Sequence, residues 1–192
     1  MMTQLVFATN NSHKIQEINA ILNGAFRIVG LQDIGCTEEL PETQATLEGN
    51  ALQKARYVQE HYGFDCFSED TGLEIAALNG APGVITARYA GEARDPEANM
   101  HLVLEQLQGT TDRRAQFRTV IALLHNGQEH LFEGIVTGRI AYEKNGTGGF
   151  GYDPIFIPNG YEETFAALPA AVKNDISHRA LATRQLIAFL RK

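Results

Sequence analysis

An antiparallel hairpin in the second half of the chain limits the folds that this sequence can adopt. Residues 115–125 and 129–141 are predicted to be strands, and Asn126-Gly127 stands at their junction. Asn-Gly favours a two-residue hairpin turn because both turn positions require positive φ. Strands joined so tightly can only pair antiparallel. Any sheet that includes them is therefore antiparallel in part.

The first half of the chain instead alternates between strand and helix patterns. The residues 12–23 form a predicted helix with Ile15, Ile18 and Leu22 on one face, and a second helix is predicted near residues 49–61. Strands are predicted at Gln4–Ala8, at Arg27–Leu31, at residues 64–70, and, beyond a turn at Thr71-Gly72, at residues 72–78. Residues 33–48 are acidic and irregular. Alternation of this kind is typical of parallel strands.

Two later helices complete the pattern. Asp95-Pro96 is a helix cap followed by proline at the first helical position, ahead of a stripe of Met100, Val103, Leu104 and Leu107. The last helix is predicted near residues 175–191. Together with the hairpin, these elements predict an α/β protein with a mixed sheet.

Length and charge narrow the classes of protein further. A chain of 192 residues suggests one domain over residues 1–192, drawn out into two lobes. The net charge of −7 argues against a broad basic face for nucleic acid, although a small basic pocket is compatible with it. No apolar run approaches the roughly 18 residues of a membrane span, and no signal peptide is evident. Cys36 and Cys66 are expected to be buried and reduced, so we expect a cytoplasmic protein.

The junction after the first strand is a candidate phosphate-binding site. The start of a helix offers free backbone N–H groups and the positive end of the helix dipole. The polar residues there add side-chain donors and, at Lys14, a full positive charge; they are Thr9, Asn10, Asn11, Ser12, His13 and Lys14. The spacing is not that of a P-loop. The alternative is an ordinary capped helix with a solvated lysine.

Residues 68–75, "SEDTGLEI", form a candidate magnesium site. Glu69 and Asp70 end an apolar strand, where acids destabilise the fold unless they have a partner. Mg²⁺ needs only one or two carboxylates when phosphates supply its other oxygen ligands. Further acids lie at Glu38, Glu39 and Glu42. The alternative is a surface turn.

Two segments near the C-terminus could bind a base. In "GTGGFGYDPIF", residues 146–156, four glycines surround Phe150, which lets the backbone approach a flat ligand while the ring stacks on it. In "KNDISHRA", the final helix is expected to begin around Asn174 or Asp175, so His178 and Arg179 would oppose the helix dipole in its first turn. A local rule broken in this way marks a candidate site. The alternatives are a flexible loop with a core phenylalanine and a solvated helix start.

Lysine for phosphate, acids for a metal, an aromatic ring for stacking and donors for a polar base edge together describe a nucleoside-triphosphate site. In this combination the sequence resembles the inosine/xanthosine triphosphate pyrophosphatases. The matching segments stand in the family's order over nearly the whole chain; they are "FATNNSHK" (7–14), "ETQATLEGNALQKA" (42–55), "SEDTGLEI" (68–75), "GAPGVITARYAG" (80–91), "GTGGFGYDPIF" (146–156) and "SHRA" (177–180).

The resemblance implies an elongated α/β fold of two lobes with a central cleft, usually as a homodimer. It implies Mg²⁺-dependent cleavage of non-standard purine nucleoside triphosphates (XTP, ITP, dITP) between the α- and β-phosphates. Asp70 would be the general base and a metal ligand, Glu42 and Glu69 would lie near the metal, and Lys14 would be catalytic. The substrate would be bound by Thr9, Asn10, Asn11, Ser12, His13, Lys14, Thr71, Phe150, Gly151, Tyr152, Asp153, Lys173, His178 and Arg179.

The sequence departs from the family pattern at a few positions. The second motif commonly has phenylalanine and then Glu-Asn-Ala, whereas this chain has Leu47 and Gly49, so no carboxylate is available at position 49. Thr86 stands where serine is usual.

The expected chemistry is attack of water on a phosphorus atom. Mg²⁺ and Lys14 would neutralise the developing charge, while Asp70 positions or deprotonates the water. His178 and Arg179 would donate hydrogen bonds to the 6-oxo group of a purine. Adenine has an amine at that position and would be rejected, because it would leave these buried donors unpaired. Two alternatives stay open, a pyrophosphatase for modified pyrimidine nucleotides and a nucleotide-binding protein without catalysis.

Overall fold

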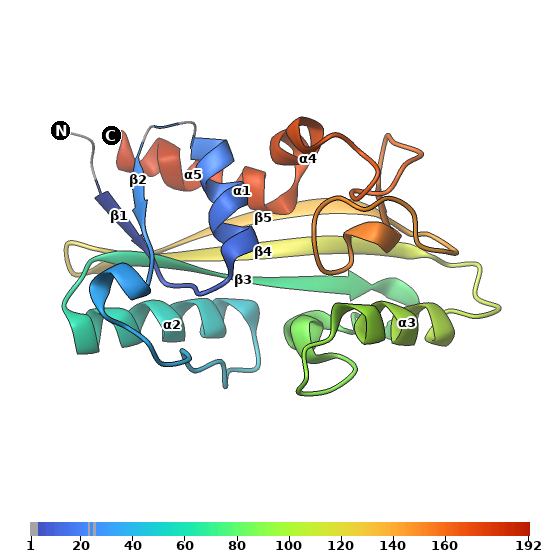
Figure 1. Ribbon diagram of the computed structural model, residues 1–192, viewed down its shortest axis with the longest axis horizontal. Coiled ribbons are helices and arrows are strands. Elements are labelled where there is room, and N and C mark those ends of the chain that lie inside the picture. Colours follow the sequence, from blue (N-terminus) through green and yellow to red (C-terminus); the bar gives the residue numbers. More distant parts are fainter. Residues whose placement is uncertain (1–3, 23, 25) are drawn as a thin grey trace. The chain divides into compact units, whose positions relative to one another are not determined.

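The computed structural model describes residues 4–22, 24 and 26–192. Six strands form one sheet in the order β2-β1-β3-β4-β5-β6 (Figure 1). β1 is parallel to β2 and to β3, whereas β5 is antiparallel to β6, so the predicted mixed α/β sheet is confirmed. The strands are β1 (Gln4–Phe7), β2 (Arg27–Val29), β3 (Cys66–Ile75), β4 (Arg114–His125), β5 (Gln128–Ile140) and β6 (Phe156–Pro158).

The helices agree with the predicted ones in number and place except near the C-terminus. They are α1 (Ser12–Leu22), α2 (Leu47–Tyr62), α3 (Pro96–Gln106), α4 (Ala170–Ile176) and α5 (His178–Leu190). The predicted end of the first helix at residue 23 lies outside the described residues. No helix in the described ranges is both long enough and apolar enough to cross a membrane. Cys36 and Cys66 are free and buried, as predicted.

The chain divides into two compact units, which are described separately. Unit 1 comprises Met1–Asp70, Thr119–Gly134 and His178–Lys192, and unit 2 comprises Thr71–Arg118 and Ile135–Ser177.

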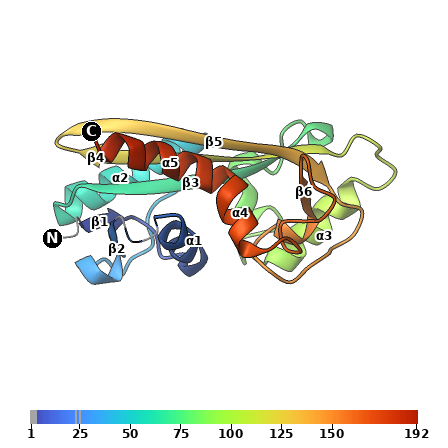
Figure 2. The same cartoon turned by 90° about the horizontal axis from the view of Figure 1, so that it is seen from above.

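In unit 1, helices cover both sides of the strands. α1 packs against α5. These two helices lie on one side of the unit 1 strands and α2 lies on the other (Figure 1), and the view from above shows α5 lying over the strands (Figure 2). Phe7 and Phe67 stack with ring centroids 4.3 Å apart within a core that also contains Leu5, Ile18, Leu22, Ile121, Leu123, Ala182 and Leu186. The strands β1 and β3 are thus buried along most of their length, whereas β2 and the unit 1 part of β5 are more exposed.

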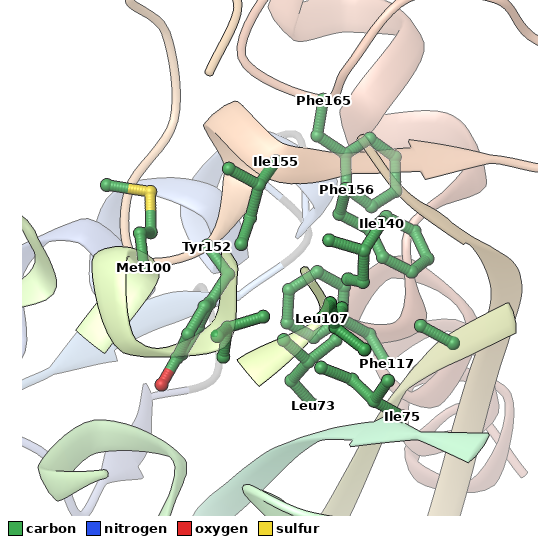
Figure 3. Packing of buried hydrophobic residues seen from close by; sticks show 12 residues of the cluster. Leu73, Ile75, Met100, Leu107, Phe117, Ile140, Tyr152, Ile155, Phe156 and Phe165 are labelled. Carbon is green, nitrogen blue, oxygen red and sulfur yellow. The ribbon is translucent and has the colours of Figure 1, made fainter. Parts of the chain in front are cut away.

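The core of unit 2 is built largely on α3. Asp95 caps this helix by accepting hydrogen bonds from the N–H groups of Glu97 and Ala98, which confirms the predicted cap. The predicted stripe is buried at Met100, Val103 and Leu107. Figure 3 shows this core, whose other large side chains are Leu73, Ile75, Phe117, Ile140, Tyr152, Ile155, Phe156 and Phe165.

The predicted hairpin is confirmed. β4 and β5 are neighbours in the sheet, and both Asn126 and Gly127 have positive φ, 52° and 75°. These are the angles of a two-residue hairpin turn whose twist matches that of the flanking strands. The Asp65 carboxylate holds the turn by accepting a hydrogen bond of 2.8 Å from the N–H of Asn126.

The predicted turn at Thr71-Gly72 is wrong, because β3 continues through both residues. Thr-Gly is a common turn dipeptide. Here, however, the segment belongs to a strand of 10 residues that is buried along most of its length, and the burial of the whole strand outweighs the local preference.

The single final helix predicted from residue 175 is also wrong. Ser177 is extended, with φ −69° and ψ 157°, and separates α4 from α5. The apolar residues of this segment do not reveal the break, because they pack on different cores. Ile176 packs on the core of unit 2, whereas Ile187 and Leu190 pack on the core of unit 1.

Candidate active site

β3 carries the two acidic residues of the candidate site to opposite faces. Successive side chains of a strand alternate between the two faces of its sheet. Glu69 accordingly contacts residues of α1 and α5, whereas Asp70 contacts residues of α2. The adjacent carboxylates therefore belong to two different environments.

Glu69 lies in a buried network of charges and is 1% exposed. Its carboxylate accepts hydrogen bonds of 2.8 and 2.7 Å from Nε and Nη2 of Arg179 and lies 3.0 Å from Nζ of Lys14. Arg179 also donates from Nη1 to Glu17, at 2.6 Å. Burial alone would raise the pKa of Glu69, but the charges of Arg179 and Lys14 outweigh it and hold the pKa below its ordinary value. Glu69 is therefore a fixed anion.

Asp70 has weaker ionic support, although it is also largely buried. Its Oδ2 accepts a hydrogen bond of 3.1 Å from Nδ2 of Asn50, and its Oδ1 lies 3.9 Å from Nζ of Lys54. Burial raises the pKa of Asp70, and the charges of Lys54 and Lys14 compensate for this only in part. A carboxylate whose pKa is raised is a suitable proton acceptor.

Lys54 joins Asp70 to the acidic loop before α2. Its Nζ donates to Oε1 of Glu42 at 2.6 Å and to the carbonyl oxygen of Glu69 at 2.8 Å. Carboxylate oxygens of Glu42 and Asp70 thus approach one cation. No cluster of three or more His, Cys, Asp or Glu that could hold a metal occurs in the described parts of the chain. Two carboxylates nevertheless suffice for Mg²⁺ shared with a polyphosphate, so this donor set fits that metal.

The glycine at position 49 fits the local packing of this loop. A Cβ built on Gly49 would lie 2.7 Å from Cβ of Gln44, closer than real Cβ contacts. The loop at Gln44 therefore lies against the backbone of Gly49, at a position where the family that the sequence resembles commonly has a side chain.

The predicted phosphate-binding junction precedes and opens α1. Asn11 caps the helix, since its Oδ1 accepts a hydrogen bond of 3.2 Å from the N–H of Lys14. Thr9 Oγ1 accepts one of 3.1 Å from the N–H of Asn11. The side chains facing solvent here are those of Asn10, Asn11, Ser12 and His13. This junction leaves polar groups open to a ligand next to Lys14.

His178 and Arg179 are the first two residues of α5 and are both buried. Gly134 in β5 makes this placement possible. A Cβ at Gly134 would lie only 2.0 Å from the carbonyl oxygen of His178 and 2.6 Å from the N–H nitrogen of Ala182. The start of α5 thus rests directly on the backbone of β5.

In unit 2, the predicted base-binding residues form their own cluster. Oδ2 of Asp153 accepts hydrogen bonds from Nζ of Lys173, at 2.5 Å, and from the N–H of Phe150, at 2.8 Å. Lys173 also lies over the Phe150 ring, 5.0 Å from its centroid. The glycines are needed here, since Gly149 has a φ of 69° and its Cβ would meet Asp153 at 2.0 Å. The aromatic ring of Phe150 is therefore held at a defined position beside a cation.

Three more of the predicted residues in unit 2 have identified environments. The Tyr152 hydroxyl donates to the carbonyl oxygen of Thr86 at 2.8 Å, so Tyr152 links the glycine-rich loop to Thr86. Gly151 has a φ of 60°, which a side chain would strain. Thr71 is partly buried within β3.

The predicted residues are divided between the two units. Unit 1 contains the junction from Thr9 to Lys14 together with Glu42, Glu69, Asp70, His178 and Arg179; unit 2 contains Thr71, Phe150, Gly151, Tyr152, Asp153 and Lys173.

Three residues of unit 1 join these groups without having been predicted: Glu17, Asn50 and Lys54. The sequence offers a signal for two of them. Asn50 and Lys54 fall on the buried stripe of α2 with Ala51, Ala55 and Val58, where polar residues need a specific partner.

Unit 1 is thus an α/β unit in which a buried arginine and two lysines contact carboxylates beside a solvent-facing helix start. The comparisons with known proteins give the family. Residues 5–189 match the Ham1 family, and the chain belongs to it.

Relatives of known name match the chain over almost its whole length. It is 54% identical to a dITP/XTP pyrophosphatase of Flavobacterium psychrophilum, with 98% of this chain and 99% of the relative covered. It is 55% identical to a dITP/XTP pyrophosphatase of Porphyromonas gingivalis, with 98% of each covered. Among solved structures, a HAM1 protein from Coxiella burnetii is 37% identical, with a TM-score of 0.90 and 99% of both chains covered.

Proposed function

We propose that this protein is a nucleoside triphosphate pyrophosphohydrolase that cleaves dITP, XTP and ITP to the monophosphate and pyrophosphate. The observation that carries the proposal is Asp70, a buried carboxylate with a raised pKa beside Lys54 and Glu42. Support for the substrate class comes from relatives about half identical in sequence that are named dITP/XTP pyrophosphatases. A protein that only bound nucleotides would have little use for such a base.

The reaction needs one proton acceptor and strong charge neutralisation. A water oxygen forms a bond to phosphorus, and the bridging P–O bond between the α- and β-phosphates breaks, so that pyrophosphate leaves with the electron pair. Asp70 accepts the proton of the water or orients it for attack. Lys14 neutralises the charge that develops on the phosphate oxygens. Glu69, which is itself held by Arg179, keeps the ammonium group of Lys14 in place.

Asp70 and Glu42 are the residues that would hold Mg²⁺ together with the substrate phosphates. The metal would supply charge neutralisation and polarisation of the phosphoryl group. Glu69 is less suited to this role than its neighbour, because both of its oxygens already accept hydrogen bonds from Arg179.

Stacking on the base is assigned to the cluster of unit 2. Phe150 would stack on the purine, with Lys173 and Asp153 fixing the ring's position. Arg179 directs three of its N–H groups to Glu17 and Glu69. We therefore assign the contact with a 6-oxo group chiefly to His178, with Arg179 holding the start of α5.

The test is release of pyrophosphate from a panel of nucleotides, with and without Mg²⁺. We expect dITP, XTP and ITP to be cleaved faster than ATP, dTTP and dUTP, and only with the metal present. Preference for the pyrimidine nucleotides would replace the proposal by the alternative pyrophosphatase. Tight binding of dITP without release of pyrophosphate would identify a nucleotide-binding protein.

A homodimer remains the expectation from the family resemblance, and a cytoplasmic location remains the expectation from the reduced cysteines. Light scattering on the purified protein measures the mass of the assembly, and a monomeric mass would contradict this expectation.

A further inference from the structure

Asn50 has a hydrogen-bonding arrangement in which the direction of every bond is determined. It is 1% exposed. Its Oδ1 accepts a hydrogen bond of 2.9 Å from the backbone N–H of Gln44, and its Nδ2 donates to Oδ2 of Asp70 at 3.1 Å. A backbone N–H can only donate, so the carbonyl oxygen of the Asn50 amide must face Gln44.

This direction carries over to Asp70. With its oxygen turned to Gln44, Asn50 presents an NH₂ group to Asp70, and this group can only donate. Oδ2 of Asp70 is therefore committed as an acceptor. Oδ1 is the oxygen that faces Lys54, at 3.9 Å, on the side where Lys54 also contacts Glu42.

The same helix fixes the loop that carries Glu42. The side chain of Gln53 accepts a hydrogen bond of 2.9 Å from the N–H of Thr43 and donates one of 2.8 Å to its hydroxyl. Asn50 holds the next residue, Gln44. Asn50 thus links the acidic loop and Asp70 through a single rigid amide.

We infer that Asn50 is a positioning residue for the reaction, which selects Oδ1 of Asp70 as the oxygen that meets the attacking water. This inference rests on the proposed pyrophosphohydrolase function. A carboxylate free to rotate would present either oxygen, at varying distances, to the water and to Lys54. A displacement of about 1 Å of a catalytic group can reduce the rate about 100-fold.

The decisive variant is Asn50→Asp, which keeps the size and still accepts the hydrogen bond from Gln44, but cannot donate to Asp70. We expect kcat for dITP to fall about 100-fold. The dissociation constant for dITP, measured by calorimetry without Mg²⁺, should change less than about threefold, because Asn50 contacts Oδ2 of Asp70 and not the nucleotide. Asn50→Ala, which adds no charge, should show the same division between kcat and binding.

Asn99 provides a matched control in unit 2. It is buried like Asn50, accepts a hydrogen bond from the N–H of Ala90 and donates one to the carbonyl oxygen of Ala87. Asn99→Asp should lower the melting temperature and leave kcat unchanged. The double variant N50D/D70N restores a donor–acceptor pair with reversed polarity, so it should recover the melting temperature lost in Asn50→Asp without recovering turnover.

The outcomes separate the inference from the proposed function. If the unmodified protein releases no pyrophosphate from dITP, the function itself fails. If the unmodified protein is active and folded Asn50→Asp and Asn50→Ala keep its kcat, the positioning role of Asn50 is overturned. Equal loss of kcat and of dITP affinity in both variants would likewise overturn it, because the effect would then lie in binding.

Discussion

Glu69 and Asp70 are adjacent in the chain and both largely buried, yet their protonation behaviour differs because their partners differ. Glu69 has Arg179 and Lys14 within hydrogen-bonding distance, which lower its pKa. Asp70 has a neutral amide and a lysine at 3.9 Å, and burial raises its pKa. Two carboxylates with opposite shifts are suited to different roles. Glu69 is suited to supporting a cation, and Asp70 is suited to accepting a proton.

Glu38 holds the acidic loop against α2. Oε1 of Glu38 accepts hydrogen bonds from the hydroxyls of Tyr62, at 2.6 Å, and Tyr57, at 3.1 Å. The bond from Tyr62 is the main cause that lowers the pKa of Glu38 from 4.5 to about 2. A group with a lowered pKa in the folded state adds stability above its unfolded pKa, and this stability is lost as pH falls through the folded pKa.

Tyr62→Phe should therefore destabilise the protein in a pH-dependent manner. The loss of unfolding free energy relative to the unmodified protein should be complete at neutral pH and should shrink between the unfolded pKa of 4.5 and the folded pKa of about 2. Urea unfolding at a series of pH values measures it. Tyr142→Phe, at an exposed tyrosine that stacks on Arg113, is the control. A deficit that stayed constant down to the lowest pH would contradict the role of Glu38.

The position of α5 depends on a glycine in the strand beneath it. His178 and Arg179 are buried at the start of this helix, and Gly134 is the point where the helix and β5 meet backbone to backbone. The atoms that a Cβ would meet there belong to backbone and cannot turn aside as a flexible side chain could. The helix must shift if position 134 acquires a side chain.

Gly134→Ala is therefore expected to lower stability by roughly 1–3 kcal/mol, the usual cost of overpacking. It should also reduce turnover of dITP, because the shift displaces Arg179 from Glu69. Thermal unfolding and pyrophosphate release measure the two effects. Gly30→Ala is the matched control, since its Cβ would meet only Asp33 Oδ2, at an ordinary 3.6 Å. Equal behaviour of the two variants would show that α5 does not need the glycine.

The elements that could be predicted from sequence are those with local causes. Asn126-Gly127 determines its turn through φ preferences, and Asp95 determines the start of α3 through its side-chain hydrogen bonds. The errors have non-local causes. β3 continues through Thr71-Gly72 because the strand as a whole is buried, and the break at Ser177 arises where residues on either side pack on different cores.

Across the whole chain, the candidate site could be predicted where residue type and segment order already pointed to nucleotide chemistry. The polar junction before α1, the acids of β3 and the glycine-rich loop were singled out in this way, and their roles at the site stay predictions. Asn50, Lys54 and Glu17 were not, because a polar residue on a helix is ordinarily solvated and the buried stripe of α2 gives only an indirect signal for the first two. Their importance arises from partners 20, 15 and 162 positions away in the chain, which only the fold brings near.

The most direct measurement is ³¹P nuclear magnetic resonance of dITP incubated with Mg²⁺ and either the unmodified protein or Asp70→Asn. The account predicts that the unmodified protein yields deoxyinosine monophosphate and pyrophosphate in equal amounts and no orthophosphate. Asp70→Asn should yield neither product while still binding dITP, and Asp112→Asn, at an aspartate paired with Arg114, should behave as the unmodified protein. Formation of the diphosphate and orthophosphate, or undiminished turnover in Asp70→Asn, would contradict it.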